Sequence, residues 1–266
     1  MNASKDYLIE YLSHAPLALA LIRAIECRKL AAQRFERPLL DLGCGDGLFG
    51  KLFFETKPEV GLDFSMHELQ AAARRQAYRS LSCGDMTRMP FADDAFATVF
   101  SNGVLEHVHH LDAALHEIAR VLRPGGRLIF TVPTTEDDLH LIGANLLRKL
   151  GLPILSDGYI QTYHNAFGHI NLFHPDDWRR RLASHGLQVI DGQSYGSPAF
   201  FRLHNLTLPA SLPNAICKRL TGFWSVLPGV RRATLAPLWA ALTRGIYQEE
   251  SAVGCSWLAV AVKPAA

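Results

Sequence analysis

Residues 39–50 read LLDLGCGDGLFG, an apolar run that ends in an acid and leads directly into three alternating glycines. Glycine has no Cβ and adopts backbone angles closed to other residues, so Gly43, Gly45 and Gly47 predict a tight turn that a nucleotide-like ligand can approach closely. The preceding apolar strand would place this turn at the carboxyl edge of a parallel sheet, where open α/β folds bind ligands. Glycine-rich turns serve many cofactors, so the rest of the site must come from residues further along the chain.

Acidic residues end each of the first three predicted strands. Asp63, in VGLDFS, could accept hydrogen bonds from two ribose hydroxyls, or cap the next helix beside Ser65. Asp85 could accept from an exocyclic amine such as the adenine N6, with Met86 against the ring face, or it could cap a loop. Asp41 could brace the glycine turn through backbone amides, or lie near a ligand's ammonium group.

A dehydrogenase is a second interpretation of the same residues. Residues 45–50 match GxGxxG, and Asp63 follows at about the spacing of a ribose-binding acid. A dehydrogenase would also need an acid–base pair for hydride transfer, and the sequence after the predicted sheet offers no clear one. Ser101 and Asn102 follow the fourth predicted strand, where small polar side chains can lie along the amino-acid part of a ligand.

Composition limits the class of protein. A chain of 266 residues with 48% hydrophobic content can bury a large core and suits one domain with insertions. A net charge of +2, without runs of like charge, does not favour nucleic-acid binding. Five scattered cysteines argue against a disulfide framework and are typical of a reducing cytoplasm. No stretch has the roughly 18 apolar residues of a spanning helix, so we expect a cytoplasmic protein that at most lies on a membrane surface.

The hydrophobic pattern alternates between strands and helices up to residue 133. Such alternation predicts a parallel sheet with right-handed crossovers, and therefore an α/β fold. Residues 6–35 show helical periodicity before the first strand. The predicted strands are 38–42, 59–63, 80–83, 96–101, 127–132, 187–191 and 256–263, and the predicted helices are 47–56, 66–77, 112–122 and 175–185.

Taken together, these motifs resemble the class I S-adenosylmethionine-dependent methyltransferases, in the broad group that includes ubiquinone- and menaquinone-pathway enzymes. The resemblance covers about 40–133, with weaker support from 169–191 and 256–263. The matching segments are DLGCGDG (41–47), VGLDFS (60–65), GDMTRMPF (84–91), DDAFATVFSNGVLEHV (93–108) and LDAALHEIARVLRPGGRLIFTVP (111–133).

The resemblance implies a Rossmann-like, seven-stranded, mostly parallel sheet flanked by helices, whose last strand is antiparallel. It implies a single domain over 1–266, with an acceptor-lid insertion at 134–170 and an apolar insertion at 196–250 before the last strand. The implied cofactor is S-adenosylmethionine, with the glycine turn and Asp41 at its methionine end, Asp63 on the ribose and Asp85 on the adenine. The implied cofactor-binding residues are Asp41, Gly43, Cys44, Gly45, Asp63, Phe64, Asp85, Met86, Ser101 and Asn102.

In this family an acceptor attacks the sulfonium methyl in line, so the protein mainly aligns the reactants, a contribution of roughly 7–11 kcal/mol. A hydroxyl or amine acceptor also needs a proton acceptor, worth about 10²–10⁴-fold in rate. His107 is the first candidate, and His164 and His169, in a segment expected to form the acceptor lid, are the second; each histidine could instead be structural. The adjacent pair His109 and His110 predicts a solvated helix start, and we expect no metal site.

The second insertion carries two apolar stretches, 220–230 and 233–243, separated by two arginines. Trp224 and Trp239, with arginines at the margins, are typical of a segment that lies on a membrane surface. The alternative is a helical cap over the acceptor pocket, or a contact between two copies. Both favour a hydrophobic or lipid-linked acceptor, and the first adds a peripheral membrane contact through 218–244. A cofactor-binding protein of the same fold without transferase activity, kept for scaffolding or regulation, is the alternative function.

Overall fold

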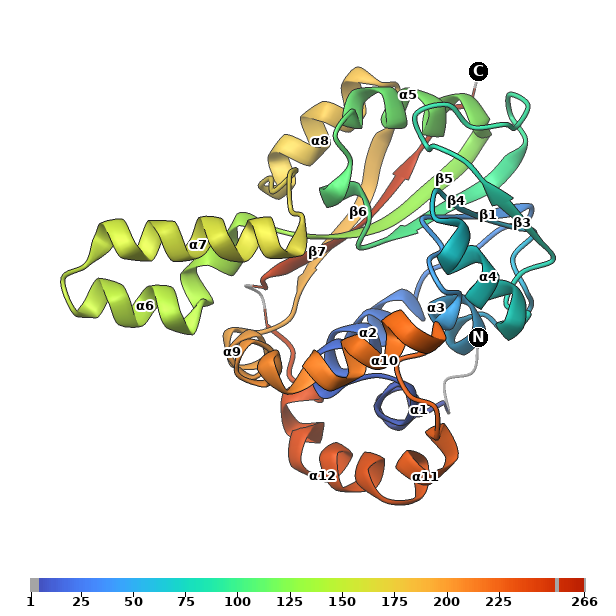
Figure 1. Cartoon of the computed structure of the whole chain (residues 1–266). Coiled ribbons are helices and arrows are strands. Elements are labelled where there is room, and N and C mark those ends of the chain that lie inside the picture. The colour runs from blue at the N-terminus through green and yellow to red at the C-terminus, as the bar shows by residue number, and fades with distance from the viewer. Residues whose placement is uncertain (1–4, 252–253, 266) are drawn as a thin grey trace.

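The computed structural model describes residues 5–251 and 254–265. A seven-stranded sheet with the order β3-β2-β1-β4-β5-β7-β6 crosses the molecule (Figure 1). Strands β1 to β5 are parallel to one another, and β7 runs antiparallel between β5 and β6. The predicted mostly parallel sheet with an antiparallel last strand is confirmed. The strands are β1 (Leu39–Leu42), β2 (Val60–Asp63), β3 (Ser80–Cys83), β4 (Phe96–Asn102), β5 (Leu122–Pro133), β6 (Gln188–Tyr195) and β7 (Ser256–Val262).

Helices cover both faces of this sheet. On one face α5 and α8 enclose a buried cluster in which Trp178 packs on Phe130 of β5. On the other face a larger cluster joins the sheet to α1, α2 and α3 and to two helices of the second insertion, α9 and α12. The helices that precede the second insertion are α1 (Tyr7–His14), α2 (Leu17–Leu30), α3 (Leu48–Phe53), α4 (Met66–Arg75), α5 (Leu111–Val121), α6 (Ile142–Lys149), α7 (Pro153–Phe167) and α8 (Pro175–Ser184).

The central strands lie between these helical layers, which explains their sequence. All four residues of β1 are buried, as are the first six of β4. Strands of a parallel sheet that are covered on both faces have continuous apolar runs, which is why both strands could be located from hydrophobicity alone. The predicted helices 47–56, 66–77 and 112–122 correspond to α3, α4 and α5.

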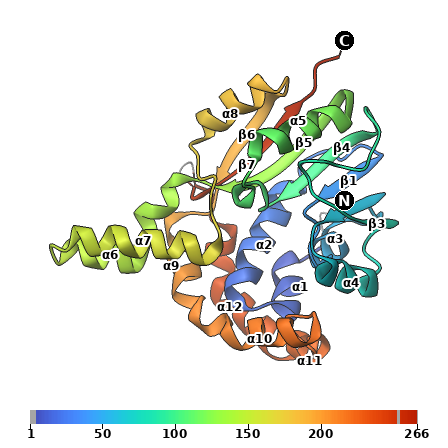
Figure 2. The same ribbon diagram turned by 45° about the horizontal axis from the view of Figure 1, so that its top comes forward.

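The first insertion forms an arm that projects from the end of the sheet (Figures 1 and 2). A 3₁₀ segment, Thr135–His140, leads into the antiparallel pair α6 and α7. Where the two helices meet, Gly143 of α6 lies so close to Tyr159 of α7 that a Cβ would stand 2.6 Å from the tyrosine ring. The left-handed Gly168 ends α7 and turns the chain back toward the sheet.

The second insertion, for which the sequence left helical and irregular structure open, consists largely of helices. Pro198, Pro213 and Pro228 occupy the first turns of helices, where the missing N–H costs nothing. Within residues 5–251 and 254–265, no helix has the length and apolar character needed to cross a membrane. The elements of this insertion are α9 (Pro198–Thr207), the 3₁₀ turn Pro209–Ser211, α10 (Leu212–Thr221), α11 (Pro228–Ala233) and α12 (Leu235–Gln248).

Candidate functional site

The glycine turn lies between β1 and α3, at the carboxyl edge of the sheet. Gly43, Gly45 and Gly47 all have positive φ, of +76°, +52° and +73°. A Cβ on Gly43 would lie 2.6 Å from Val104, whereas one on Gly45 would meet nothing within 4 Å. The turn therefore requires glycine for its backbone, and at Gly45 it leaves open space for a ligand.

Strand β2 holds this turn in place. The N–H groups of Gly43 and Cys44 donate to the carbonyl of Leu62, at 2.8 and 3.0 Å. The N–H of Gly45 donates to Oδ2 of Asp63, at 2.8 Å. Because these amides are already bonded, the turn can cradle a ligand by its shape and its remaining carbonyl lone pairs.

Asp63 is the link between the turn and the next helix. Its Oδ1 accepts from the N–H of Ser65 at 2.8 Å, and Ser65 itself caps α4 through the N–H of Glu68 at 3.3 Å. Asp63 is therefore not the helix cap that was the alternative interpretation. Each carboxylate oxygen keeps a lone pair for a further donor, and the side chain lines an open cavity of about 700 Å³.

This first cavity brings together the residues predicted for ribose and adenine. It is bounded by β2, by the loop after β3 and by residues 104–110. Phe64 stands on its rim with 82% of its surface exposed. Met86 packs against the apolar core behind it, and Asp85 caps its own loop by accepting from the N–H of Thr87 at 2.8 Å. Asp85 therefore caps its loop, as the alternative interpretation predicted, and also lines the cavity.

A second cavity, of about 180 Å³, lies on the other side of the glycine turn and is lined by Asp41, Gly43 to Asp46 and Asn102. Asp41 is buried and accepts from the hydroxyl of Tyr78 at 2.7 Å. The bonds that brace the turn come from Leu62 and Asp63, so Asp41 does not have the bracing role that was its alternative. Burial raises the pKa of Asp41 to about 7, against the opposing effect of the Tyr78 hydroxyl.

Of the two polar residues that end β4, Asn102 reaches this cavity and Ser101 does not. Asn102 donates to Glu26 at 2.9 Å and accepts from Thr131. Ser101 is fully buried in the core, and its hydroxyl has no hydrogen-bond partner among the described residues. Successive side chains of a strand point to opposite faces, so only one of the pair could face the ligand.

A third cavity, of about 160 Å³, is adjacent to the second, since Leu19 and Arg23 of α2 line both. Arg23 forms an ion pair with Glu26 at 2.7 Å. Glu106 and Asp137 also line this cavity, both buried and each with one carboxyl oxygen that has no partner among the described residues. Burial raises the pKa of Glu106 to about 8.

Sequence reasoning missed these charged residues of the third cavity. One signal was present, because Arg23 and Glu26 interrupt the apolar sequence LALALIRAIEC of α2. Charged residues are seldom buried unless paired, so a charged pair in an otherwise apolar helix indicates a polar site.

The three candidate histidines lie together between the first and third cavities. Nδ1 of His107 is 2.9 Å from the carbonyl of Gly168, which can only accept, so Nδ1 carries the proton and Nε2 is the accepting nitrogen. His107 lines the first cavity and His169 the third, with ring centroids 5.5 Å apart. Burial lowers the pKa of His107, and lowers that of His169 to about 4, so both rings are neutral near pH 7. His164 is buried behind them, with Nδ1 3.2 Å from Nδ1 of His169.

The predicted solvated pair His109 and His110 lies at the edge of the first cavity. Across the part of the chain that the structure describes, no three His, Cys, Asp or Glu side chains gather as a metal site. All five cysteines are free thiols.

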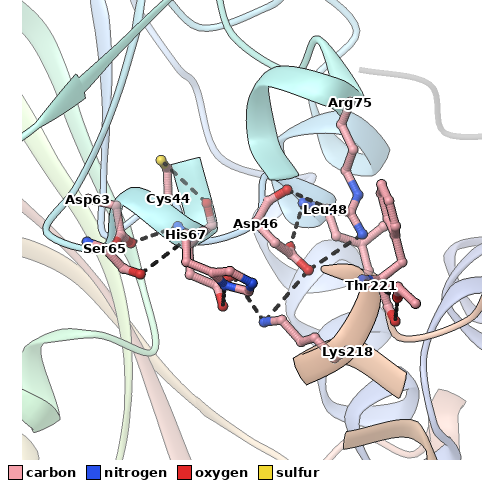
Figure 3. A network of polar contacts seen from close by, with 12 residues as sticks. Cys44, Asp46, Leu48, Asp63, Ser65, His67, Arg75, Lys218 and Thr221 are labelled. Carbon is pink, nitrogen blue, oxygen red and sulfur yellow. Dashed lines mark hydrogen bonds and ion pairs between the residues drawn. The ribbon is translucent and has the colours of Figure 1, made fainter. Parts of the chain in front are cut away.

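Helix α10 of the second insertion is attached to the glycine turn by a polar network (Figure 3). Nζ of Lys218 lies 3.1 Å from Glu68 Oε2 and 3.7 Å from Asp46 Oδ2. Arg75 donates to the carbonyl of Asp46 at 2.8 Å, and Arg74 donates to the carbonyl of Thr221 at 3.2 Å. The insertion thus closes one side of the second cavity, which Lys218 and Trp224 line.

An open α/β sheet with a glycine turn after its first strand and a carboxylate at the end of its second is typical of proteins that bind a nucleotide-like cofactor. Residues 40–130 of the 266 match the family model described as a methyltransferase domain. This match favours the methyltransferase interpretation over the dehydrogenase one.

Relatives that carry the name methyltransferase match part of the chain, and a solved structure has the same fold. A malonyl-[acyl-carrier protein] O-methyltransferase of Legionella pneumophila is 37% identical over 128 residues, which cover 45% of this chain and 44% of that protein. A demethylmenaquinone methyltransferase of Mycolicibacterium paratuberculosis is 46% identical over 94 residues, covering 34% of this chain and 40% of that one. The chain thus matches less than half the length of either relative. The crystal structure of a SAM-dependent methyltransferase from Thermotoga maritima has a TM-score of 0.57 at 14% identity, covers 93% of this chain and 91% of that chain, and shows the shared fold.

Proposed function

We propose that this protein transfers the methyl group of S-adenosylmethionine to a hydrophobic acceptor, either a small molecule or a lipid-linked group. The observation that carries the proposal is that the three cavities are neighbours and share lining residues. Gly43 lines both the first and the second, and Arg23 lines both the second and the third. An elongated cofactor would lie across the glycine turn, with the acceptor beyond α2.

The residues present fit this cofactor. Asp63 offers two carboxylate oxygens to ribose hydroxyls, while Phe64, Asp85 and Met86 surround the space for adenine. Asp41 in the second cavity provides a carboxylate for an ammonium group, and Arg23 provides a cation for a carboxylate. The bound cofactor would supply an electrophilic methyl group, and the role of the protein is to hold the acceptor in line with it and to exclude water.

Both insertions would enclose the acceptor. Tyr163, Phe167 and His169 of the first line the third cavity, and so do Phe201 and His204 of the second. Neutral His107 and His169 rings are suited to accept the proton of a hydroxyl or amine.

We extend the predicted peripheral membrane contact through 218–244 back to the start of α10 at Leu212. Its outer face consists of Leu212, Ile216 and Leu220, which are 65%, 54% and 80% exposed, with the exposed Arg219 beside them. A helix with an exposed apolar stripe and a basic margin suits the surface of a membrane with anionic lipids. A cytoplasmic enzyme with this contact could reach a lipid-linked acceptor without a spanning helix.

The experiment uses methyl-labelled S-adenosylmethionine, the purified protein and extract from cells lacking the gene, with organic and aqueous phases counted separately. We expect label in the organic phase. Label in the aqueous phase alone would refute a lipid acceptor. If labelled cofactor binds but no transfer occurs in either phase, the chain is a cofactor-binding protein without transferase activity.

The membrane contact has its own test, sedimentation with vesicles that contain anionic lipid. The Leu212→Ser, Ile216→Ser and Leu220→Ser triple variant should lose vesicle binding while retaining cofactor affinity, because the three side chains face away from the cofactor cavities. A wild-type protein that stays in the supernatant at low salt would contradict the contact.

A further inference from the structure

We propose that Asp138, His164 and His169 form a proton relay that leads away from the acceptor cavity. His169 takes the proton of the acceptor, His164 takes the next proton along the relay, and Asp138 is the positioning residue and counter-ion. The proposal rests on the proposed methyl transfer and adds to it the route by which the acceptor loses its proton. Asp138 belongs to no motif that the sequence singled out.

The local backbone brings the three side chains together. Asp138 lies in the 3₁₀ segment before α6, and His164 lies in the last turn of α7. Gly168, with φ of +67°, turns the chain so that the N–H of His169 donates to the carbonyl of His164 at 2.9 Å. His169 is therefore held beside His164 by the end of the helix rather than by a free loop.

The hydrogen-bond partners assign the protons once each histidine ring is taken to carry one proton and Asp138 to act as an acceptor. Oδ1 of Asp138 lies 2.6 Å from Nε2 of His164, and because an ionised carboxylate can only accept, Nε2 carries the proton. A neutral His164 must then accept at Nδ1, so Nδ1 of His169, 3.2 Å away, is the donor. This leaves Nε2 of neutral His169 without a proton, and His169 lines the acceptor cavity.

The relay compensates for a weak base. Burial is the main reason why the pKa of His169 falls to about 4, and the neighbouring His107 and His164 lower it further. A proton would therefore be held poorly if it stayed on His169. Glu106 and Asp137, in the same cavity, are held largely protonated by burial, and Tyr163 packs beside both His164 and His169.

The proton balance is as follows. The acceptor's oxygen or nitrogen would take up the methyl group, and the electron pair of the broken carbon–sulfur bond would stay on sulfur. The proton of that oxygen or nitrogen moves to Nε2 of His169. The proton on Nδ1 of His169 then passes to Nδ1 of His164. The positive charge ends on the His164 imidazolium against the carboxylate of Asp138, where an opposite charge within about 4 Å stabilises it. His169 is neutral again.

Nuclear magnetic resonance of the full-length protein tests this arrangement without any acceptor. Long-range ¹H–¹⁵N spectra at pH 7 should show His164 protonated at Nε2 and His169 protonated at Nδ1 only. The Asp138→Ala variant should convert both rings to mixtures of tautomers, while His107, fixed by Gly168, is unchanged. Asp157→Ala, an exposed carboxylate on the same helix as His164, is the matched control and should alter none of them.

Asp138→Asn separates geometry from charge. Its amide oxygen can still accept from Nε2, so the tautomers should persist, but the imidazolium loses its counter-ion. With the acceptor fraction identified by methyl labelling, both Asp138 variants should lower kcat by about 10- to 100-fold with an unchanged KM for the cofactor.

Two results would overturn the relay. One is a wild-type His169 with its proton on Nε2, and the other is an Asp138→Ala spectrum that matches wild type while unchanged His107 signals show intact folding. Absence of methyl transfer with the expected tautomers would refute the proposed function alone.

Discussion

Asp41 should make cofactor binding depend on pH. It ends β1 with only 3% of its surface exposed, and burial raises its pKa to about 7. The cavity it lines is the one proposed for the methionine end of the cofactor, which carries an ammonium group. In the free protein, much of Asp41 is therefore protonated at neutral pH and must ionise before it can pair with that group.

The size of the effect follows from this pKa. If only the ionised form binds well, about 10% of the protein is competent at pH 6 and about 90% at pH 8, a change of about ninefold in apparent affinity, or about 1.3 kcal/mol. The α-amino group of the cofactor, taken to have a pKa of about 7.7–8.0, loses its own proton in the same range, which reduces this gain by about half at pH 8 and ends it above pH 8. For folding, the sign is opposite: native Asp41 holds a proton that unfolded Asp41 releases above about pH 4, so its contribution to stability falls as pH rises from about 4 to 7.

Calorimetric titration with S-adenosylhomocysteine between pH 6 and pH 8 measures this effect. The Asp41→Asn variant should bind S-adenosylhomocysteine weakly, with an affinity that no longer depends on pH. This result would assign the pH dependence to Asp41 rather than to Glu106 or the histidines. Tyr78→Phe should move the midpoint to higher pH, because the Tyr78 hydroxyl stabilises the ionised carboxylate. A wild-type affinity that is flat from pH 6 to pH 8, or an Asp41→Asn variant that keeps the slope, would refute the reasoning.

Three further substitutions test the site. Gly43→Ala combines positive φ with a 2.6 Å collision, and should lower the free energy of unfolding by at least about 1–3 kcal/mol in thermal denaturation. Gly125→Ala should lower it less, because Gly125 has φ of +75° but lies in open space. Asp63→Ala should weaken binding of S-adenosylhomocysteine by about 10- to 100-fold in calorimetry, since it removes the ribose acceptor and a bond to the glycine turn; unchanged affinity would exclude the ribose role. Lys218→Met should weaken the same binding by about two- to fivefold and speed dissociation in stopped flow, whereas the exposed Arg219→Met should not.

The parts of the site that are local in the chain could be predicted from the sequence. The glycine turn follows β1, Asp63 is the last residue of β2 and Asp85 lies two residues after β3. Parallel strands bring their carboxyl ends to one edge of the sheet. The sequence could not choose between Ser101 and Asn102, because that choice depends on which face of β4 meets the second cavity.

Residues contributed from distant segments could not be predicted in this way. Arg23 reaches the site because α2 packs across the sheet, and Lys218 reaches it because α10 folds back onto α4. Hydrophobic periodicity predicts single helices and strands, and does not predict contacts between segments that are distant in the chain. Prolines break helices in their interiors, but in the second insertion three of them lie in the first turns of helices.

Helix α10 has a polar, half-buried face and an apolar, exposed face. Asn214, Lys218 and Thr221 lie on the half-buried side, where Lys218 pairs with the acids of the glycine turn and α4. The apolar stripe that starts at Leu212 lies on the opposite side, with each of its side chains more than half exposed. Because α10 has only 10 residues, a contact on its outer face would also affect the position of Lys218 on its inner face. Under the proposed function, contact with a membrane would thus hold α10 down over the cofactor cavity at the place where a lipid-linked acceptor arrives. A single element would then couple closure of the cofactor cavity to the location of the acceptor.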